Sequence, residues 1–183
     1  NGGDFGIILS NTGNTGFFTV TGDGTTATQG GNDSGGVIQN TNTGVRLTAG
    51  VHNVTLQNMT IGNTAATPAN GPNGTAGIAL DGIFADNVTG LTLNNITVAE
   101  TGQDAIHAQD VTNFVLNDSH ILNAGNGDEE HGIDFNELRG DNFIRGSVFD
   151  AFNETGIEVI NTSGTVDITI DDTTFQDNKN TVG

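Results

Sequence analysis

Two sets of acidic and histidine residues recur beside short apolar segments and could carry out acid–base chemistry. In the first set, Asp81, Asp104 and His131 each lie two residues before the leading apolar residue of such a segment. Carboxylates and imidazoles are the side chains that most often act as general acids and bases. If the segments lie side by side, the three groups meet at one place and could transfer protons to and from a substrate.

The second set follows the leading apolar residues. His107, Asp134 and Glu158 come directly after Ile106, Ile133 and Ile157. On stacked parallel strands they would share one face at steps of about 5 Å. The alternative is that they form the ordinary polar exterior of an acidic protein, because exposed charges on strands are the rule.

A third candidate is a glycine-rich and oxygen-rich loop over residues 123–130. Its possible Ca²⁺ ligands are Asn126, Asp128, Glu129 and Glu130, because Ca²⁺ takes several oxygen ligands from flexible loops. The spacing matches neither an EF-hand nor the calcium-binding nonapeptide repeat, so a solvated acidic loop is the alternative. We expect no other cofactor.

The elements that must position these residues follow an imperfect repeat. Its leading apolar residues are separated by 38, 38, 23, 27 and 24 residues. They are Ile7, Val45, Ile83, Ile106, Ile133 and Ile157. One such coil cannot bury its own apolar face, whereas stacked coils can. The sequence therefore predicts one all-β domain over residues 1–183, with six coils and a seventh that begins at Val182.

The repeat also predicts which side chains point inward. Ile83 and Ala85 should lie in the core and Phe84 outside, because side chains alternate along a strand. Asn58, Asn95, Asp118 and Asp172 follow the second strand of their coils and should adopt left-handed turn conformations. The extra length of the long coils should form loops, one of them at residues 63–76 with Pro68 and Pro72.

Composition excludes some partners. The 183 residues carry 4 Lys and Arg against 22 Asp and Glu, a formal charge of -18. Nucleic acid is excluded because phosphate binding needs a basic patch. No apolar run approaches the ~20 residues that span a membrane, so we expect no membrane insertion.

The chain resembles the right-handed parallel β-helix repeat proteins across nearly all of its length. The run at residues 53–61, Asn-Val-Thr-Leu-x-Asn-x-Thr-Ile, is typical of them. The resemblance implies a solenoid of about six to seven coils. The composition, rich in Gly, Asn and Thr and poor in Lys, is most similar to the large adhesin-like proteins of bacterial surfaces, which implies an extracellular location.

A weaker similarity is to the polygalacturonase-type pectinases. In them an Asp-Gly, a paired Asp-Asp and a Gly-His-Gly occupy successive coils, at the positions of Asp81, Asp104 and His131. This implies catalytic roles for those residues, with His107 and Asp134 beside them. The match is partial, because Gln103 stands in place of one carboxylate, Glu130 replaces a glycine, and no Arg-x-Lys follows.

Two interpretations of function remain open. The first is a non-enzymatic structural or adhesive module, which binds further β-helix coils or copies of itself through open ends and builds a larger surface protein or a filament. It is favoured by the repeat and by the incomplete catalytic motif. The second is a carbohydrate-binding or polysaccharide-degrading protein that uses the face carrying His107 and Asp134.

Overall fold

The computed structural model describes residues 3–23, 30–63 and 77–179. These residues form β-strands and turns and include no helix. The expected Pro-containing loop, apart from Asn63, and the expected seventh coil at Val182 lie outside the described residues. The predicted all-β class is confirmed.

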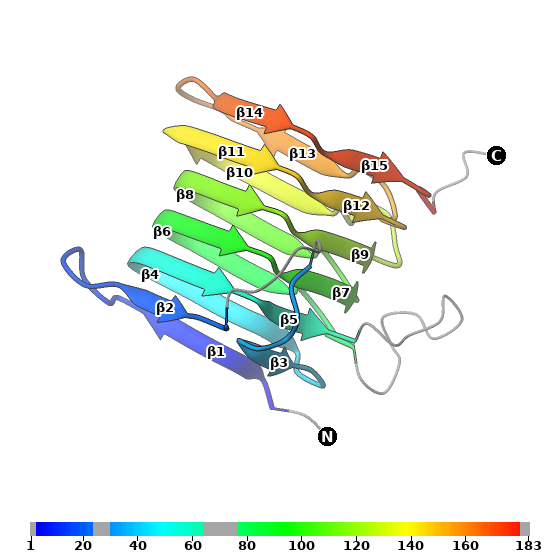
Figure 1. Ribbon diagram of the computed structural model, residues 1–183. Coiled ribbons are helices and arrows are strands. Elements are labelled where there is room, and N and C mark those ends of the chain that lie inside the picture. The colour runs from blue at the N-terminus through cyan, green and yellow to red at the C-terminus, as the bar shows by residue number, and fades with distance from the viewer. Residues whose placement is uncertain (1–2, 24–29, 64–76, 180–183) are drawn as a thin grey trace.

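The strands form two sheets of parallel strands, which Figure 1 shows as two stacks side by side. The first sheet contains β1 (Phe5–Ser10), β2 (Phe18–Val20), β4 (Thr43–Gln57), β6 (Ile83–Asn94), β8 (Ile106–Asn117), β10 (Ile133–Arg139), β11 (Asp141–Arg145), β13 (Ile157–Ile160) and β14 (Asp167–Asp171). The second contains β3 (Gly36–Ile38), β5 (Met59–Gly62), β7 (Thr97–Thr101), β9 (His120–Ala124), β12 (Val148–Asp150) and β15 (Thr174–Gln176). In each sheet, a strand pairs with the equivalent strand of the next repeat.

The long strands of the first sheet each contain two extended stretches. In β6, left-handed backbone at Asn87 and Gly90, with φ of 56° and 75°, lies between them. The first stretch of β8 pairs with β10 and its second stretch pairs with β11. Each repeat therefore contributes three short extended segments, two to the first sheet and one to the second.

The inward columns are those predicted from the sequence. Ile83 and Ala85 are fully buried, and Phe84 between them is partly exposed. The column continues through Val45, Ile106 and Ile133, all fully buried, while the outermost Ile7 and Ile157 are partly buried. The core is thus a continuous stack of apolar rows.

The predicted left-handed turn residues are also confirmed. Asn58, Asn95, Asp118 and Asp172 have φ between 46° and 54°. Gly146, with φ of 57°, takes this place in the repeat between Asp118 and Asp172. Asparagine, aspartate and glycine are the residues that tolerate this conformation best.

The structure settles the register around residue 143, where the repeat is irregular. Phe143 pairs with Val115 and Ile144 with Leu116, so Ile144 is the inward residue. Asn142 then takes the inward position next to Phe114 and is 1% exposed. Its side chain accepts a hydrogen bond from the Phe114 amide and donates to the carbonyls of Arg139, Gly140 and Asp167. The buried amide is therefore well satisfied.

A row of small residues precedes the leading apolar residues. A Cβ atom added to Gly82 would lie 2.3 Å from Cγ1 of Val98 and 2.6 Å from the carbonyl oxygen of Ala105. Gly44 and Gly132 face the same two kinds of neighbour in their own repeats. Close approach of the two sheets at this corner therefore requires small residues.

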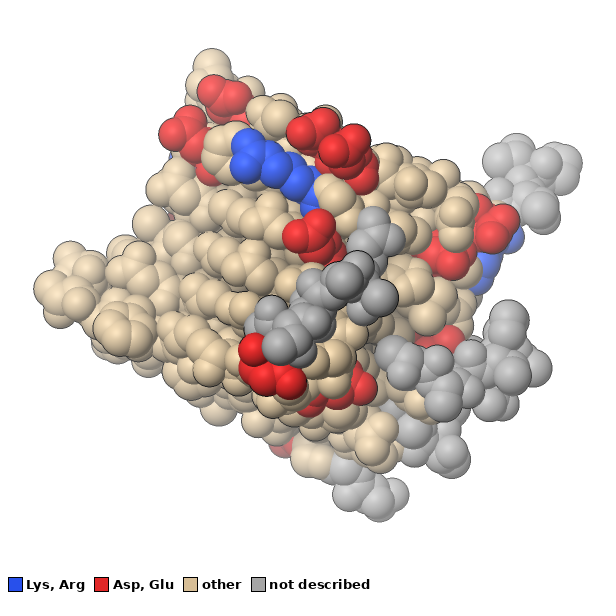
Figure 2. Space-filling view, viewed as in Figure 1, with Lys and Arg blue, Asp and Glu red and all other residues tan. Residues whose placement is uncertain are grey.

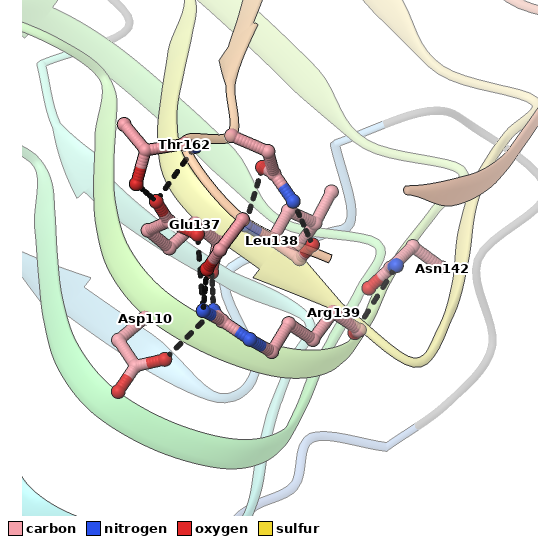
Figure 3. Close-up of polar contacts among 8 residues, drawn as sticks. Asp110, Glu137, Leu138, Arg139, Asn142 and Thr162 are labelled. Carbon is pink, nitrogen blue, oxygen red and sulfur yellow. Dashed lines mark hydrogen bonds and ion pairs between the residues drawn. The ribbon is translucent and has the colours of Figure 1, made fainter. Parts of the chain in front are cut away.

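On another corner, a polar network joins three repeats (Figure 3). Arg139 of β10 donates to Asp110 of β8 and to Glu137, both at 3.0 Å. Glu137 in turn accepts a hydrogen bond from the backbone of Thr162, which follows β13. The pairs are partly exposed, so their contribution to stability is small, but they fix the turns of adjacent repeats relative to one another.

Candidate functional site

The candidate site is a pocket of about 690 Å³ on the outer face of the first sheet. It lies where β6, β8, β10 and β13 begin, together with the turns that precede these strands. Its lining residues are Asp81, Phe84, Gln103, Asp104, His107, Glu129, His131, Asp134, Asn136, Glu154, Glu158 and Ile160. Both predicted sets of acid–base residues therefore meet in one pocket.

Strand register explains why the residues converge. Phe84, His107, Asp134 and Glu158 are paired in succession across β6, β8, β10 and β13. Parallel neighbours lie about 4.8 Å apart, so their side chains form a row. Asp81, Asp104 and His131 enter beside this row from the preceding turns and are all buried, at 9%, 6% and 6% exposure.

His107 lies between two carboxylates. Its Nδ1 is 3.1 Å from Oδ2 of Asp104 and 3.2 Å from Oδ2 of Asp134. The hydrogen bonds to Asp104 and then to Asp134 raise the pKa of His107 to about 10. The imidazole is therefore protonated at neutral pH, and its positive charge offsets part of the negative charge of the pocket.

The environment of Asp81, in contrast, disfavours the charged form of its side chain. Burial, and then the nearby charge of Asp104, raise the pKa of Asp81 to about 6 from its ordinary value of 3.8. A carboxyl with this pKa is largely protonated in mildly acidic solution. It can therefore donate a proton at a pH at which ordinary carboxyls are ionised.

Several polar atoms around the pocket are fixed by the protein, and two are not. The backbone amide of His131 donates to Oδ1 of Asp104 at 2.6 Å, and Nε2 of His131 lies 3.5 Å from Oε2 of Glu158. In contrast, Oδ1 of Asp134 and Nδ1 of His131 are buried and have no hydrogen-bond partner among the described residues. Buried polar atoms are rarely left unpaired, and a rotation of either side chain at the pocket wall would let a ligand or water supply the partner.

A metal ion is one possible occupant. Asp81, Asp104 and His107 offer ligand atoms that all lie within 4.8 Å of one another. Without a metal, the hydrogen bonds to Asp104 and Asp134 raise the pKa of His107 to about 10, and a metal that binds this imidazole has to displace its proton. The imidazolium itself therefore supplies the cation of this cluster.

The four predicted Ca²⁺ ligands of the loop at residues 123–130 do not all point to one place. The Glu130 carboxylate accepts hydrogen bonds from the backbone amides of Asn126 and Gly127, and so holds the loop itself. Glu129 instead reaches the pocket, and Asp128 is exposed. Ca²⁺ binding by Asn126, Asp128, Glu129 and Glu130 stays a prediction.

Sequence reasoning missed part of the pocket. Glu154 and Ile160 line it, yet neither occupies a repeated position of the two predicted sets. Glu154 comes from the turn before β13, and its carboxylate accepts a hydrogen bond from the backbone amide of Glu129. The turn before each strand carries a polar residue in several repeats, and that signal alone could have indicated Glu154.

In comparisons with known proteins, no family model, curated protein or solved structure matched the chain. The site must therefore be interpreted from its own geometry. Over residues 3–23, 30–63 and 77–179, we also find no helix with the length and apolar character that crossing a membrane would require.

Three of the four basic residues contact residues outside the pocket lining, and Arg46 contacts one lining residue, Phe84. The Cζ atom of Arg46 lies 4.9 Å from the centroid of the Phe84 ring, which also stacks with His107. The guanidinium of Arg145 lies over the ring of Phe143. Arg139 belongs to the network between repeats, and Lys179 donates to the carbonyl of Gly125. On the face that Figure 2 shows, the few basic side chains likewise lie beside acidic ones. None of the four Lys and Arg residues lines the pocket.

Proposed function

We propose that the chain is a right-handed parallel β-helix whose pocket binds a glycan and hydrolyses it by acid–base catalysis. The observation that supports this best is the convergence of Asp81, Asp104, His107, His131 and Asp134 in one pocket. In this proposal each repeat is one coil, and the resemblance to polysaccharide-active β-helix proteins agrees with the location on the first-strand face.

Two carboxyls with different environments are what glycoside hydrolysis requires. Asp81, whose raised pKa keeps it protonated in mildly acidic solution, would give its proton to the glycosidic oxygen as the bond to the anomeric carbon breaks. Asp134 would take a proton from the water that attacks this carbon. Its Oδ2 is held by His107 and Asn136. Its Oδ1 is buried and has no partner within the described part of the chain, and a rotation of the carboxylate would bring it to that water.

Asp104 would act as a positioning residue. Its two oxygens bind Nδ1 of His107 and the backbone amide of His131, which leaves it poorly placed to take up a proton from water. The negative charge of Asp104 also contributes to the raised pKa of Asp81. The partial match to the pectinase motif, with one carboxylate fewer, is thus compensated by Asp134 from the neighbouring row.

The test is a screen of neutral, amino-bearing and uronic polysaccharides for the release of reducing ends. The protein is compared with the Asp134→Asn variant, which keeps the size of the side chain. We expect at least one glycan to be cleaved and the variant to be slower by about a hundred-fold or more, the scale of a lost general base. If the protein and the variant give equal rates on every glycan, hydrolysis at this site is refuted.

The second candidate function is the structural or adhesive module on a bacterial cell surface. It is favoured by exposed apolar residues on the outermost strands, since Ile170 of β14 and Phe175 of β15 are 48% and 44% exposed. Among the described residues, β14 pairs only with β11 and β15 only with β12, so each strand has one unpaired edge. Unpaired strand edges can bind further strands. In this function the partner would be further coils or a second copy, stacked end to end outside the cell.

Self-stacking is tested by the concentration dependence of the mass in light scattering. We expect the apparent mass to rise with concentration, and substitution of Ile170 by Asp to reduce that rise, because a buried unpaired charge opposes association. A mass that stays that of a single chain at every concentration would exclude stacking of copies.

A further inference from the structure

The charges of the pocket narrow the class of glycan that it can accept. Six carboxyl side chains line it, from Asp81, Asp104, Glu129, Asp134, Glu154 and Glu158. The lining includes no Lys or Arg: Arg46 lies over the ring of Phe84 without lining the pocket itself, and the other three basic residues make contacts outside the lining. The cation of the pocket lining is the imidazolium of His107, whose Nδ1 lies between the carboxylates of Asp104 and Asp134.

A uronic or sulfated glycan is therefore a poor ligand. Its negative groups would approach carboxylates with no Lys or Arg to receive them, since the imidazolium of His107 is already bound to Asp104 and Asp134, and like charges brought together are costly. A positively charged ligand is instead attracted to the pocket, because an acidic cleft raises the local concentration of cations.

The pocket also contains an acceptor that needs a donor. Asp134 is 8% exposed, and its Oδ1 has no hydrogen-bond partner among the residues that the structure describes. Because Oδ1 is buried, a rotation of the carboxylate has to bring it to the pocket surface. A hydroxyl or an ammonium group can then satisfy it, and an ammonium forms the stronger, charge-assisted bond. Ile160, at 48% exposure on the same wall, adds apolar surface on which the C–H face of a sugar ring can lie.

From these observations we infer that the pocket recognises a glycan that carries free amino groups, such as an oligomer of glucosamine. The inference rests on the proposed glycan site and names its substrate class. Ammonium groups along the sugar chain bind the carboxylates of Glu154, Glu158 and Asp134, and the ring faces contact Ile160.

The experiment measures binding by titration calorimetry with three probes of equal length. They are a glucosamine oligomer, its N-acetylated form, which is neutral, and an oligogalacturonate, which is anionic. We expect saturable one-to-one binding of the glucosamine oligomer, at least about ten-fold tighter than that of the neutral form, with the difference shrinking as salt screens the charges. Equal affinity for the neutral form, or tighter binding of the oligogalacturonate, would overturn the inference.

A polycation can also bind any acidic protein without a specific site, and variants separate this case from the proposal. Glu158→Gln and Glu154→Gln each remove one charge from the pocket, whereas Asp141→Asn removes one exposed charge of β11 outside it. The pocket variants should weaken binding several-fold and the β11 variant should not. Equal effects of all three would show non-specific attraction and overturn the inference.

The outcome also distinguishes this inference from the proposed function. Tight, selective binding of the glucosamine oligomer, with no cleavage of it or of any glycan in the screen, would leave the inference standing and remove hydrolysis. Cleavage of a neutral or uronic glycan, with no preference for amino groups, would leave hydrolysis standing and remove the inference.

Discussion

Replacing Asp81 with asparagine is expected to abolish hydrolysis and, at the same time, to stabilise the folded protein at neutral pH. Loss of the general acid should slow glycan cleavage by about a hundred-fold to ten-thousand-fold. Asparagine has nearly the same size, so the buried site should stay filled. The folded protein should gain stability because the buried Asp81 carboxyl, which is costly to ionise, is no longer present.

The sign of that gain comes from the pKa of Asp81. The carboxyl ionises near 3.8 when exposed and near a pKa of about 6 in the folded protein, so the folded state binds the proton more tightly. The free energy of unfolding therefore falls as pH rises between these values and stays at the lower level above them. At about 1.4 kcal/mol for each pKa unit, the cost above pH 6 is about 3 kcal/mol at most.

The measurement is chemical denaturation of both proteins from pH 3.5 to 8. The asparagine variant should match the parent at the acidic end and exceed it above pH 6. Asp86→Asn, on β6 directly after the turn that carries Asp81 but outside the pocket, serves as the control and should change neither activity nor the pH dependence. A stability difference that does not vary with pH would contradict the proposed environment of Asp81.

The largest effect on folding alone is expected for Phe114→Ala. Phe114 is fully buried in the second stretch of β8, and its ring packs edge-on against Phe135 with 5.0 Å between ring centroids. Removing a buried phenylalanine ring costs about 3–5 kcal/mol through lost burial and the cavity left behind. We expect a loss of that size in the free energy of unfolding.

The control is Phe17→Ala, the same substitution at a residue that is 82% exposed. It should change stability by about 0.5 kcal/mol or less, as surface substitutions do. Because stacked repeats contact chiefly their neighbours, hydrogen exchange should show the largest loss of protection in the strands beside β8. A loss below 1 kcal/mol for Phe114→Ala would mean that the inward row is not the core described above.

The rows of the fold were predictable because they depend on alternation and repetition. Ile83 and Ala85 inward, Phe84 outward, and left-handed turns at Asn58 and Asn95 all follow from local chemistry repeated in frame. The pairing of successive repeats then brought His107 and Asp134 together as expected. These features need no knowledge of how the two sheets approach each other.

Other features depend on contacts between sheets or between distant turns, and the sequence could not reveal them. Asn142 occupies an apolar row because three carbonyls and one amide surround its side chain. Gly82 is required by Val98 of the opposite sheet. Glu154 reaches the pocket from a turn whose path no periodicity specifies. The burial that raises the pKa of Asp81 is likewise a property of the assembled pocket.

The row of pocket side chains at one register position repeats at the spacing of the strands. Phe84, His107, Asp134 and Glu158 share one backbone position in four consecutive repeats, so they succeed one another at the strand spacing of about 4.8 Å. A linear polymer that lies across the strands meets them as consecutive subsites. Duplication or loss of a whole repeat would then lengthen or shorten the binding site by one such step, while every remaining repeat kept its own interior.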